Sequence, residues 1–289
     1  MNKSQEEQHF FSVVVPTYER PEDLRKCLES LRYEKQLSTK KYEIIVTDDS
    51  KSEKCKELVD QEFPDVKWGK GKQNGPGGNR NAGAKHATGD WIIFIDDDCI
   101  ADRGYIKAYT EAIRQNPDTV LFEGRIYPDR PRKTWAECCP ENSSGNMFWT
   151  SNLCVQKKVF DKIGGFDERF RVAYEDIDFA YRIQAQGFNA AFIKDASVCH
   201  PWRTLKQEGN NWKPKGFEVS ELLLFIQKHP NAKEHNSTLV YLSHLSRMIT
   251  TDLSKCVFHF KGNGIQTLFS QIITTLLVIK KLTLTKYKV

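Results

Sequence analysis

Three consecutive carboxylates, Asp96, Asp97 and Asp98, follow an apolar run at residues 91–95. Carboxylates this close repel one another, which destabilises a fold unless a cation or hydrogen-bond donors compensate. A divalent metal ion is the simplest compensation, because hard cations prefer oxygen ligands. The cluster therefore predicts a site that binds a metal or a substrate, in preference to a solvated acidic turn.

Asp48 and Asp49 follow a second apolar run, at residues 42–47. Asp-Asp-Ser is also ordinary turn chemistry, so the pair alone leaves a solvated turn and a binding site equally open. A carboxylate in this place could accept hydrogen bonds from a nucleotide base or from a ribose hydroxyl. Together, the two acidic segments suit a nucleotide with a metal-bound diphosphate.

Glu175 and Asp176 stand at the start of a predicted helix whose later residues are largely apolar. Carboxylates favour the first turn of a helix, so alone they are expected to cap it. His200 follows a strand-like run at residues 190–198. A lone histidine is expected to be structural more often than a ligand.

A glycine-rich segment at residues 75–83 contains Arg80. It matches neither common phosphate-binding pattern, because Ala84 stands where a P-loop needs lysine and Arg80 where a dinucleotide fingerprint needs its last glycine. These departures argue against a kinase and against a dehydrogenase. The segment still predicts a turn that opens a helix and presents Arg80 to an anionic ligand.

The elements that must position these side chains alternate along the chain. Strands are predicted at residues 10–15, 42–47 and 91–95, and helices at 21–33, 52–63 and 103–115. This alternation predicts an α/β fold with a mostly parallel sheet and helices on both faces. Ligands of such sheets bind beyond the carboxyl ends of the strands, where both acidic segments fall.

From residue 119 onward the pattern is less regular. Residues 127–149 are predicted to form a long loop, and helices are predicted at 157–163, 175–186, 217–227 and 239–251. No stretch reaches the ~20 consecutive apolar residues of a membrane span, and residues 1–9 do not resemble an export signal. The expected compartment is the cytoplasm. The eight cysteines form no Cys-x-x-Cys pair, which argues against a zinc site of the usual spacing.

The order of the motifs resembles that of family 2 glycosyltransferases. Their donor half is similar to Val-Val-Val-Pro-Thr-Tyr-Glu-Arg at 13–20, Val-Thr-Asp-Asp-Ser at 46–50, Arg-Asn-Ala-Gly at 80–83 and Gly-Asp-Trp-Ile-Ile-Phe-Ile-Asp-Asp-Asp at 89–98. Their acceptor half is similar to Gly-Gly-Phe-Asp-Glu at 164–168 and Glu-Asp-Ile-Asp-Phe-Ala-Tyr-Arg at 175–182. The resemblance implies a GT-A type nucleotide-binding sheet with flanking helices, spanning residues 10–203, with a donor half at 10–126 and an acceptor half at 127–203.

The resemblance also implies roles for single residues. Pro16, Tyr18 and Asp49 would line the base pocket of a nucleotide-sugar donor, with UDP-sugars as the default, and Arg80 would lie beside it. Asp96 and Asp97 would contact the donor, and Asp98 and His200 would bind Mn²⁺ or Mg²⁺. Asp176 would be the general base of an inverting, one-step displacement, with Glu175 orienting it or contacting the acceptor. The resemblance thus adds Pro16 and Tyr18 to the candidate residues named above.

Two further features bear on the acceptor. The Gln-x-x-Arg-Trp motif of processive synthases is absent from the sequence, so transfer of one sugar to a glycan or lipid-linked acceptor is expected. Residues 204–289 are expected to be mostly helical, and six lysines but no acidic residue follow Asp252. An amphipathic pattern at 265–277 leaves open packing on the body, a homodimer and shallow attachment to an anionic membrane surface. No nucleic-acid partner is expected.

Two other functions compete with a glycosyltransferase. A sugar-1-phosphate nucleotidyltransferase also needs a nucleotide site with metal-binding carboxylates, but it normally carries a glycine-rich loop with arginine after the first strand, where this chain has Pro16-Thr17-Tyr18. A non-catalytic sensor of nucleotide sugars is the other alternative. The presence of both Asp98 and Asp176 argues against it.

Overall fold

The computed structural model describes residues 10–36, 42–204, 216–232, 238–259 and 265–286. The chain divides into two compact units. The first comprises Met1–Pro128, Pro140–Arg171 and Glu175–Pro201, and the second comprises Asp129–Cys139, Val172–Tyr174 and Trp202–Val289. The N-terminal segment at 1–9, considered above as an export signal, lies outside the described residues.

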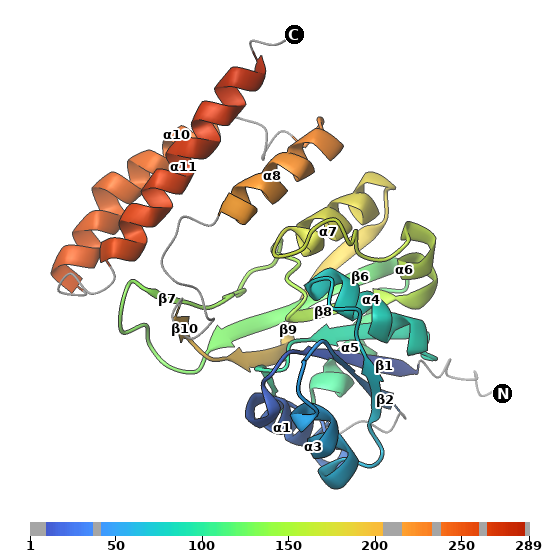
Figure 1. Ribbon diagram of the computed structural model, residues 1–289. Coiled ribbons are helices and arrows are strands. Elements are labelled where there is room, and N and C mark those ends of the chain that lie inside the picture. Colours follow the sequence, from blue (N-terminus) through green and yellow to red (C-terminus); the bar gives the residue numbers. More distant parts are fainter. Residues whose placement is uncertain (1–9, 37–41, 205–215, 233–237, 260–264, 287–289) are drawn as a thin grey trace. The chain divides into compact units, whose positions relative to one another are not determined.

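One sheet of eight strands forms the centre of the first unit, in the order β3-β2-β1-β4-β8-β6-β9-β5 (Figure 1). Its first four strands are parallel neighbours: β3 (Lys67–Lys70), β2 (Tyr42–Asp48), β1 (Phe11–Thr17) and β4 (Trp91–Ile95). The other four are β8 (Asn152–Gln156), β6 (Thr119–Pro128), β9 (Asn189–His200) and β5 (Ile100–Ala101). Only β8 and β5 run against the rest of these described strands. The predicted α/β fold with a mostly parallel sheet is confirmed.

Alternate residues of the central strands point to opposite faces of the sheet, and each face has its own apolar core. Val13 and Ile93 belong to one core, which also receives α1 (Pro21–Ser30), α3 (Lys54–Glu62) and α5 (Tyr105–Gln115). Val14 and Phe94 belong to the other, which receives α4 (Pro76–His86), α6 (Lys157–Ile163) and α7 (Glu175–Ala185). Figure 1 shows α1 and α3 on one side of the sheet and α4, α6 and α7 on the other. The helix predicted at 21–33 ends earlier, at Ser30, and a separate short helix, α2 (Tyr33–Gln36), begins at Tyr33.

Strands β6 and β8 were not predicted, because polar residues interrupt their apolar pattern. At Gly124 of β6 an added Cβ would lie 2.2 Å from the carbonyl oxygen of Ala196, so the close approach of β9 requires glycine. Asn152 of β8 is fully buried, and its Oδ1 accepts hydrogen bonds from Tyr105 at 2.9 Å and Tyr109 at 2.7 Å. Its Nδ2 donates to the Ala196 carbonyl at 2.9 Å. This satisfied polar network fastens β9 to the sheet.

The second unit contains a two-stranded sheet and a group of helices. Strand β7 (Glu137–Cys138) pairs with β10 (Arg203–Thr204), and the helices are α8 (Gly216–Lys228), α10 (Thr238–Arg247) and α11 (Ile265–Lys286), with π-helical turns η1 (Met248–Asp252) and η2 (Lys255–His259) between the last two. These helices agree with the predicted helical character of residues 204–289. Among the described residues, no helix is long and apolar enough to span a membrane.

Candidate active site

Asp96, Asp97 and Asp98 lie in a tight turn between β4 and β5. The preceding strand is almost completely buried, and the amide of Cys99 donates a hydrogen bond to the Asp96 carbonyl at 3.1 Å to close the turn. Strand β5 then pairs with the end of β9, with Ile100 opposite Cys199. This pairing brings the acidic turn beside His200, the last residue of β9.

Asp98 and His200 form the part of the site that best fits a divalent cation. The His200 Nε2 atom lies 3.3 Å from Asp98 Oδ1, and both side chains are at least nine-tenths buried. The Nδ1 atom lies 2.8 Å from the Pro201 carbonyl, which can only accept, so Nδ1 carries a proton. When the ring is neutral, Nε2 and the carboxylate therefore present lone pairs to each other. A divalent cation between them would be bound by both atoms, because imidazole nitrogen and carboxylate oxygen are both common metal ligands.

Cys99 completes a group of three potential ligand atoms that lie within 4.8 Å of one another. Its thiol is fully buried, and burial with the nearby aspartates raises the pKa of Cys99 well above its usual range. A thiol must lose its proton to bind a metal ion, so Cys99 offers a costlier ligand than Asp98 and His200. Cys99 was not predicted as a ligand, although it directly follows the acidic turn.

Asp97 is held from the first strand. Thr17, at the end of β1, donates a hydrogen bond from Oγ1 to Asp97 Oδ2 at 2.7 Å, and the residue is only 4% exposed. Burial, reinforced by the charge of Asp98, raises the pKa of Asp97 to about 7. The carboxylate therefore sits where additional positive charge is favourable.

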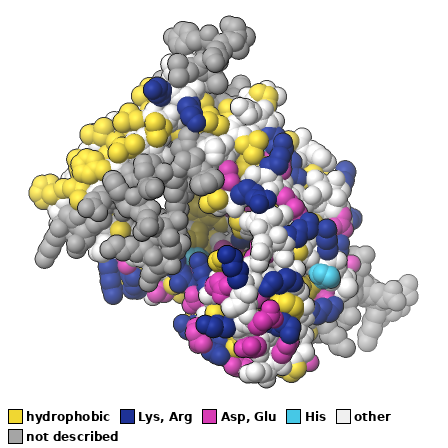
Figure 2. All heavy atoms as spheres, viewed as in Figure 1, with side chains coloured by type: hydrophobic (Ala, Val, Ile, Leu, Met, Phe, Trp, Pro, Cys, Tyr) yellow, Lys and Arg dark blue, Asp and Glu magenta, His cyan; other side chains and the backbone are white. Residues whose placement is uncertain are grey.

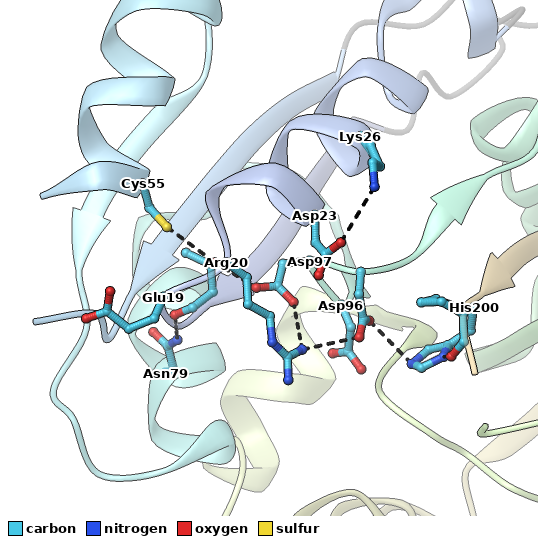
Figure 3. A network of polar contacts seen from close by, with 12 residues as sticks. Glu19, Arg20, Asp23, Lys26, Cys55, Asn79, Asp96, Asp97 and His200 are labelled. Carbon is cyan, nitrogen blue, oxygen red and sulfur yellow. Dashed lines mark hydrogen bonds and ion pairs between the residues drawn. The ribbon is translucent and has the colours of Figure 1, made fainter. Parts of the chain in front are cut away.

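Arg20 supplies positive charge to this turn, a role that was not predicted from the sequence. Its Nη1 atom lies 3.4 Å from Asp97 Oδ1 and 3.2 Å from Asp98 Oδ2. Figure 3 shows the guanidinium group of Arg20 pointing from the loop after β1 toward Asp97. The residue closes the Val-Val-Val-Pro-Thr-Tyr-Glu-Arg motif, which was its only signal in the sequence.

Arg80 joins the acidic turn to the helix that carries the predicted base. Its Nη2 atom contacts Asp96 Oδ1 at 2.5 Å and its Nη1 atom contacts Glu175 Oε1 at 3.0 Å. Arg80 is 5% exposed, so these are the contacts of a buried ion-paired bridge. An added Cβ at Gly77 would lie 3.2 Å from the Glu175 Cβ, which shows how closely α4 approaches α7.

Glu175 and Asp176 begin α7 in different surroundings. Burial raises the pKa of Glu175 to about 8, with a further contribution from Asp176 that Arg80 opposes. Burial also raises the pKa of Asp176, whose Oδ1 accepts a hydrogen bond from the Ile177 amide at 2.8 Å. Asp176 thus makes a local hydrogen bond at the start of α7, as expected of a capping residue. Glu175 instead pairs with Arg80 on α4, which capping does not explain. A carboxylate with a raised pKa is a better proton acceptor near neutral pH.

The residues expected to hold a base lie at the ends of β1 and β2. Pro16 pairs in register with Thr47, the Asp49 amide donates to the Thr17 carbonyl at 3.1 Å, and Tyr18 is 55% exposed. Asp49 Oδ1 accepts a hydrogen bond from the Gln73 amide at 2.9 Å, and burial raises the pKa of Asp49. All three predicted residues thus lie at the edge of the sheet that also carries the acidic turn.

Glu168 is a further residue whose role the sequence analysis missed. Its carboxylate accepts hydrogen bonds from Asn74 at 2.6 Å, Lys72 at 3.2 Å and Asn81 at 3.2 Å. These contacts tie the motif at 164–168 to the loop that precedes α4. Through Asn81, which lies on α4 next to Arg80, Glu168 helps to hold the helix that carries Arg80.

Comparison with known proteins agrees with this geometry. Residues 12–177, more than half of the chain, match the model of glycosyl transferase family 2. An uncharacterized glycosyltransferase of Haemophilus influenzae is 27% identical over 60% of this chain and 61% of its own. A glucosyl-dolichyl phosphate glucuronosyltransferase of Haloferax volcanii is 28% identical over 54% of this chain and 55% of its own. The chain thus spans less than two thirds of either relative.

A solved structure confirms the fold. The crystal structure of S. aureus TarS 1-349 in complex with UDP-GlcNAc matches with a TM-score of 0.59 at 19% identity, over 85% of this chain and 74% of that chain. The expected GT-A type sheet with flanking helices is therefore observed. With its motifs in order at one edge of that sheet, the chain belongs to glycosyl transferase family 2.

Proposed function

We propose that the protein is an inverting, metal-dependent glycosyltransferase that moves one sugar from a UDP-sugar to a hydroxyl group of a glycan or lipid-linked acceptor. The observation that carries the proposal is the buried bridge in which Arg80 contacts Asp96 on one side and Glu175 on the other. The bridge supports the proposal because it joins the acidic turn, where a metal-bound nucleotide would bind, to a pair of carboxylates with raised pKa values, and a single displacement at an anomeric carbon needs both.

Each carboxylate has a separate task in this proposal. Asp176 accepts the proton of the acceptor hydroxyl as that oxygen attacks, and Glu175, held by Arg80, orients it. Asp98 and His200 would hold Mn²⁺ or Mg²⁺, which supplies positive charge to the departing diphosphate. Asp96 and Asp97 lie toward the donor, and Thr17 fixes the orientation of Asp97.

The base of the donor is assigned to the edge formed by Pro16, Tyr18 and Asp49. A carboxylate whose pKa is raised by burial gains from a hydrogen-bond donor, and the imide of uracil offers one. The structure in complex with UDP-GlcNAc supports the choice of a uridine donor. The name of the Haloferax volcanii relative supports a lipid-linked acceptor. We accordingly place the enzyme in the cytoplasm, at the inner face of a membrane.

The Asp176→Asn variant tests the central assignment. It keeps the size of the side chain but cannot accept the proton, so we expect transfer to fall by about 10²-fold or more while the affinity for UDP stays within about twofold. Asp161→Asn, on α6, changes an exposed carboxylate outside the site and serves as the matched control.

The readouts are hydrolysis of a panel of nucleotide sugars with Mn²⁺ or Mg²⁺ and calorimetric binding of UDP. Normal turnover by Asp176→Asn would remove the proposed base. A nucleotidyltransferase would instead form a nucleotide sugar and diphosphate when given a sugar 1-phosphate and a nucleoside triphosphate. A sensor would bind UDP without turnover in either assay.

A further inference from the structure

The helices of the second unit expose an unusual amount of apolar surface. Of the thirteen large apolar side chains that are exposed among the described residues, eight lie between Leu242 and Leu277: Leu242, Ile249, Val257, Phe258, Phe269, Ile273, Leu276 and Leu277. Figure 2 shows apolar side chains following one another along these helices. We name this set the apolar face. Isolated exposed apolar residues are normal, but a continuous set indicates a binding surface.

Helix α11 is apolar on two sides. One side packs within the unit through Leu268, Val278 and Leu282, which are at most 4% exposed. The other side carries Phe269, Ile273 and Leu276, which recur at intervals of four and three residues and are each more than 40% exposed. Among the described side chains of α11, the outer side is therefore apolar and exposed, where a surface helix of a globular protein normally carries polar residues.

The charges around the apolar face have one sign. Arg247, Lys255, Lys280 and Lys281 are exposed among the described residues from Thr238 onward. Asp252, the last acidic residue of the chain, is only 9% exposed and lies 3.7 Å from Arg247. A bilayer that contains anionic lipids has negatively charged headgroups over an apolar layer of acyl chains. Exposed apolar side chains beside exposed cations fit both layers of such a surface.

We propose that the apolar face of α10, η1, η2 and α11 docks the enzyme on an anionic lipid bilayer, with Phe258, Ile273 and Leu276 entering the boundary of the acyl chains and Lys255 and Lys280 contacting lipid phosphates. Phe258 is 83% exposed in the turn between the two helices. A second copy of the chain fits this surface less well. Two copies joined through the face would bring lysines together, and the described residues after Asp252 offer no carboxylate to pair with them.

The inference rests on the proposed function in one respect, because a lipid-linked acceptor is the reason for the enzyme to bind a membrane. Membrane docking and sugar transfer can still be disproved separately. Full-length protein is sedimented with vesicles of phosphatidylcholine alone or with phosphatidylglycerol added. We expect binding only to the anionic vesicles, and we expect it to weaken as salt is raised.

Two variants test the two halves of the surface. Phe258→Ser/Leu276→Ser removes exposed apolar area, and Lys255→Gln/Lys280→Gln removes charge; each is expected to lower vesicle binding by about tenfold or more. The matched controls lie on the first unit: Met147→Ser, which is 43% exposed in the native chain, and Lys158→Gln, also exposed. Both controls are expected to bind vesicles as the native chain does.

Hydrolysis of the donor without acceptor is measured on the same samples, and it is expected to be unchanged in all of these variants. Equal binding of all variants to vesicles, or no binding by the native chain, would overturn the docking surface and leave the transferase activity standing. A dimer in light scattering that Phe258→Ser/Leu276→Ser converts to a monomer, without vesicle binding, would assign the face to a second copy. Loss of donor hydrolysis in every sample would contradict the proposed function and not the surface.

Discussion

The Nε2 atom of His200 lies 3.3 Å from the Oδ1 atom of Asp98, although His200 ends β9 and Asp98 lies in the turn after β4. The contact depends on the pairing of β5 with β9, which carries the acidic turn to the end of β9. Neither residue by itself indicates a metal site. Together they offer nitrogen and oxygen ligands on a buried, rigid support.

Replacing His200 with glutamine is expected to weaken Mn²⁺ binding by about tenfold to a hundredfold, because a metal site loses at least this much when its ligand set is disturbed. Isothermal titration calorimetry without donor measures the effect. His86→Gln, an exposed histidine on α4, is the control. Equal Mn²⁺ affinity in the His200 and His86 variants would exclude His200 as a ligand.

Replacing Arg20 with glutamine is expected to strengthen Mn²⁺ binding severalfold. Arg20 neutralises part of the charge of Asp97 and Asp98, and its side chain is 38% exposed, so the interaction is worth no more than about 1 kcal/mol. The titration is best done near pH 8, where protons compete less for Asp97. Arg25→Gln, which removes ion pairs elsewhere on α1, controls for net charge. Weaker Mn²⁺ binding by Arg20→Gln would mean that Arg20 mainly holds the side chains of Asp97 and Asp98 in place, and that neutralising their charge matters less.

Replacing Arg80 with methionine is expected to destabilise the fold by about 3–5 kcal/mol, because Asp96 and Glu175 are left without their shared cation. Chemical denaturation measures the change. The loss should be smaller at pH 6 than at pH 8, since the raised pKa of Glu175 lets a proton replace the guanidinium. Arg169→Met removes an exposed pair with Asp167 and should cost less than about 1 kcal/mol. A loss for Arg80→Met that does not change with pH would contradict this account.

The pKa of Asp97 predicts how stability depends on pH. Because burial raises this pKa to about 7, the folded chain keeps a proton that the unfolded chain releases near its ordinary value of about 4. The contribution of Asp97 to the free energy of unfolding therefore falls as pH rises between these values and is constant above them. With a chelator present, the melting temperature of the native chain minus that of Asp97→Asn should fall by a few degrees from about pH 5 to about pH 7.5. A difference independent of pH would show that Asp97 does not titrate in this range.

The position of the acidic turn and of Asp49 could be predicted from the sequence, because it depends on local rules. The apolar run 91–95 predicted a buried strand, and the polar residues after it had to lie at the edge where ligands bind. The same reasoning placed Asp49. These inferences need only the period of the strands and their alternation with helices.

The rest depends on contacts between distant segments, which local pattern does not encode. Glu175 looks like a capping residue until Arg80 is found beside it, and Arg20 gives no sign of facing Asp98. Strand β8 was missed because its first residue, Asn152, is a buried amide whose four partners come from α5, β6 and β9. Polar residues with tertiary partners are the ones that an apolar pattern cannot reveal.

The bridge through Arg80 also couples the charge states of the two carboxylates that it contacts. One guanidinium group contacts both Asp96 and Glu175. A change in the charge of one carboxylate therefore changes the strength of the ion pair with the other. Such a dependence is reciprocal: if ligand binding beside Asp96 alters the proton affinity of Glu175, then the protonation of Glu175 alters that binding by the same factor. If the proposed function is correct, donor binding beside Asp96 is therefore coupled to the protonation of Glu175, the residue next to the proposed base Asp176.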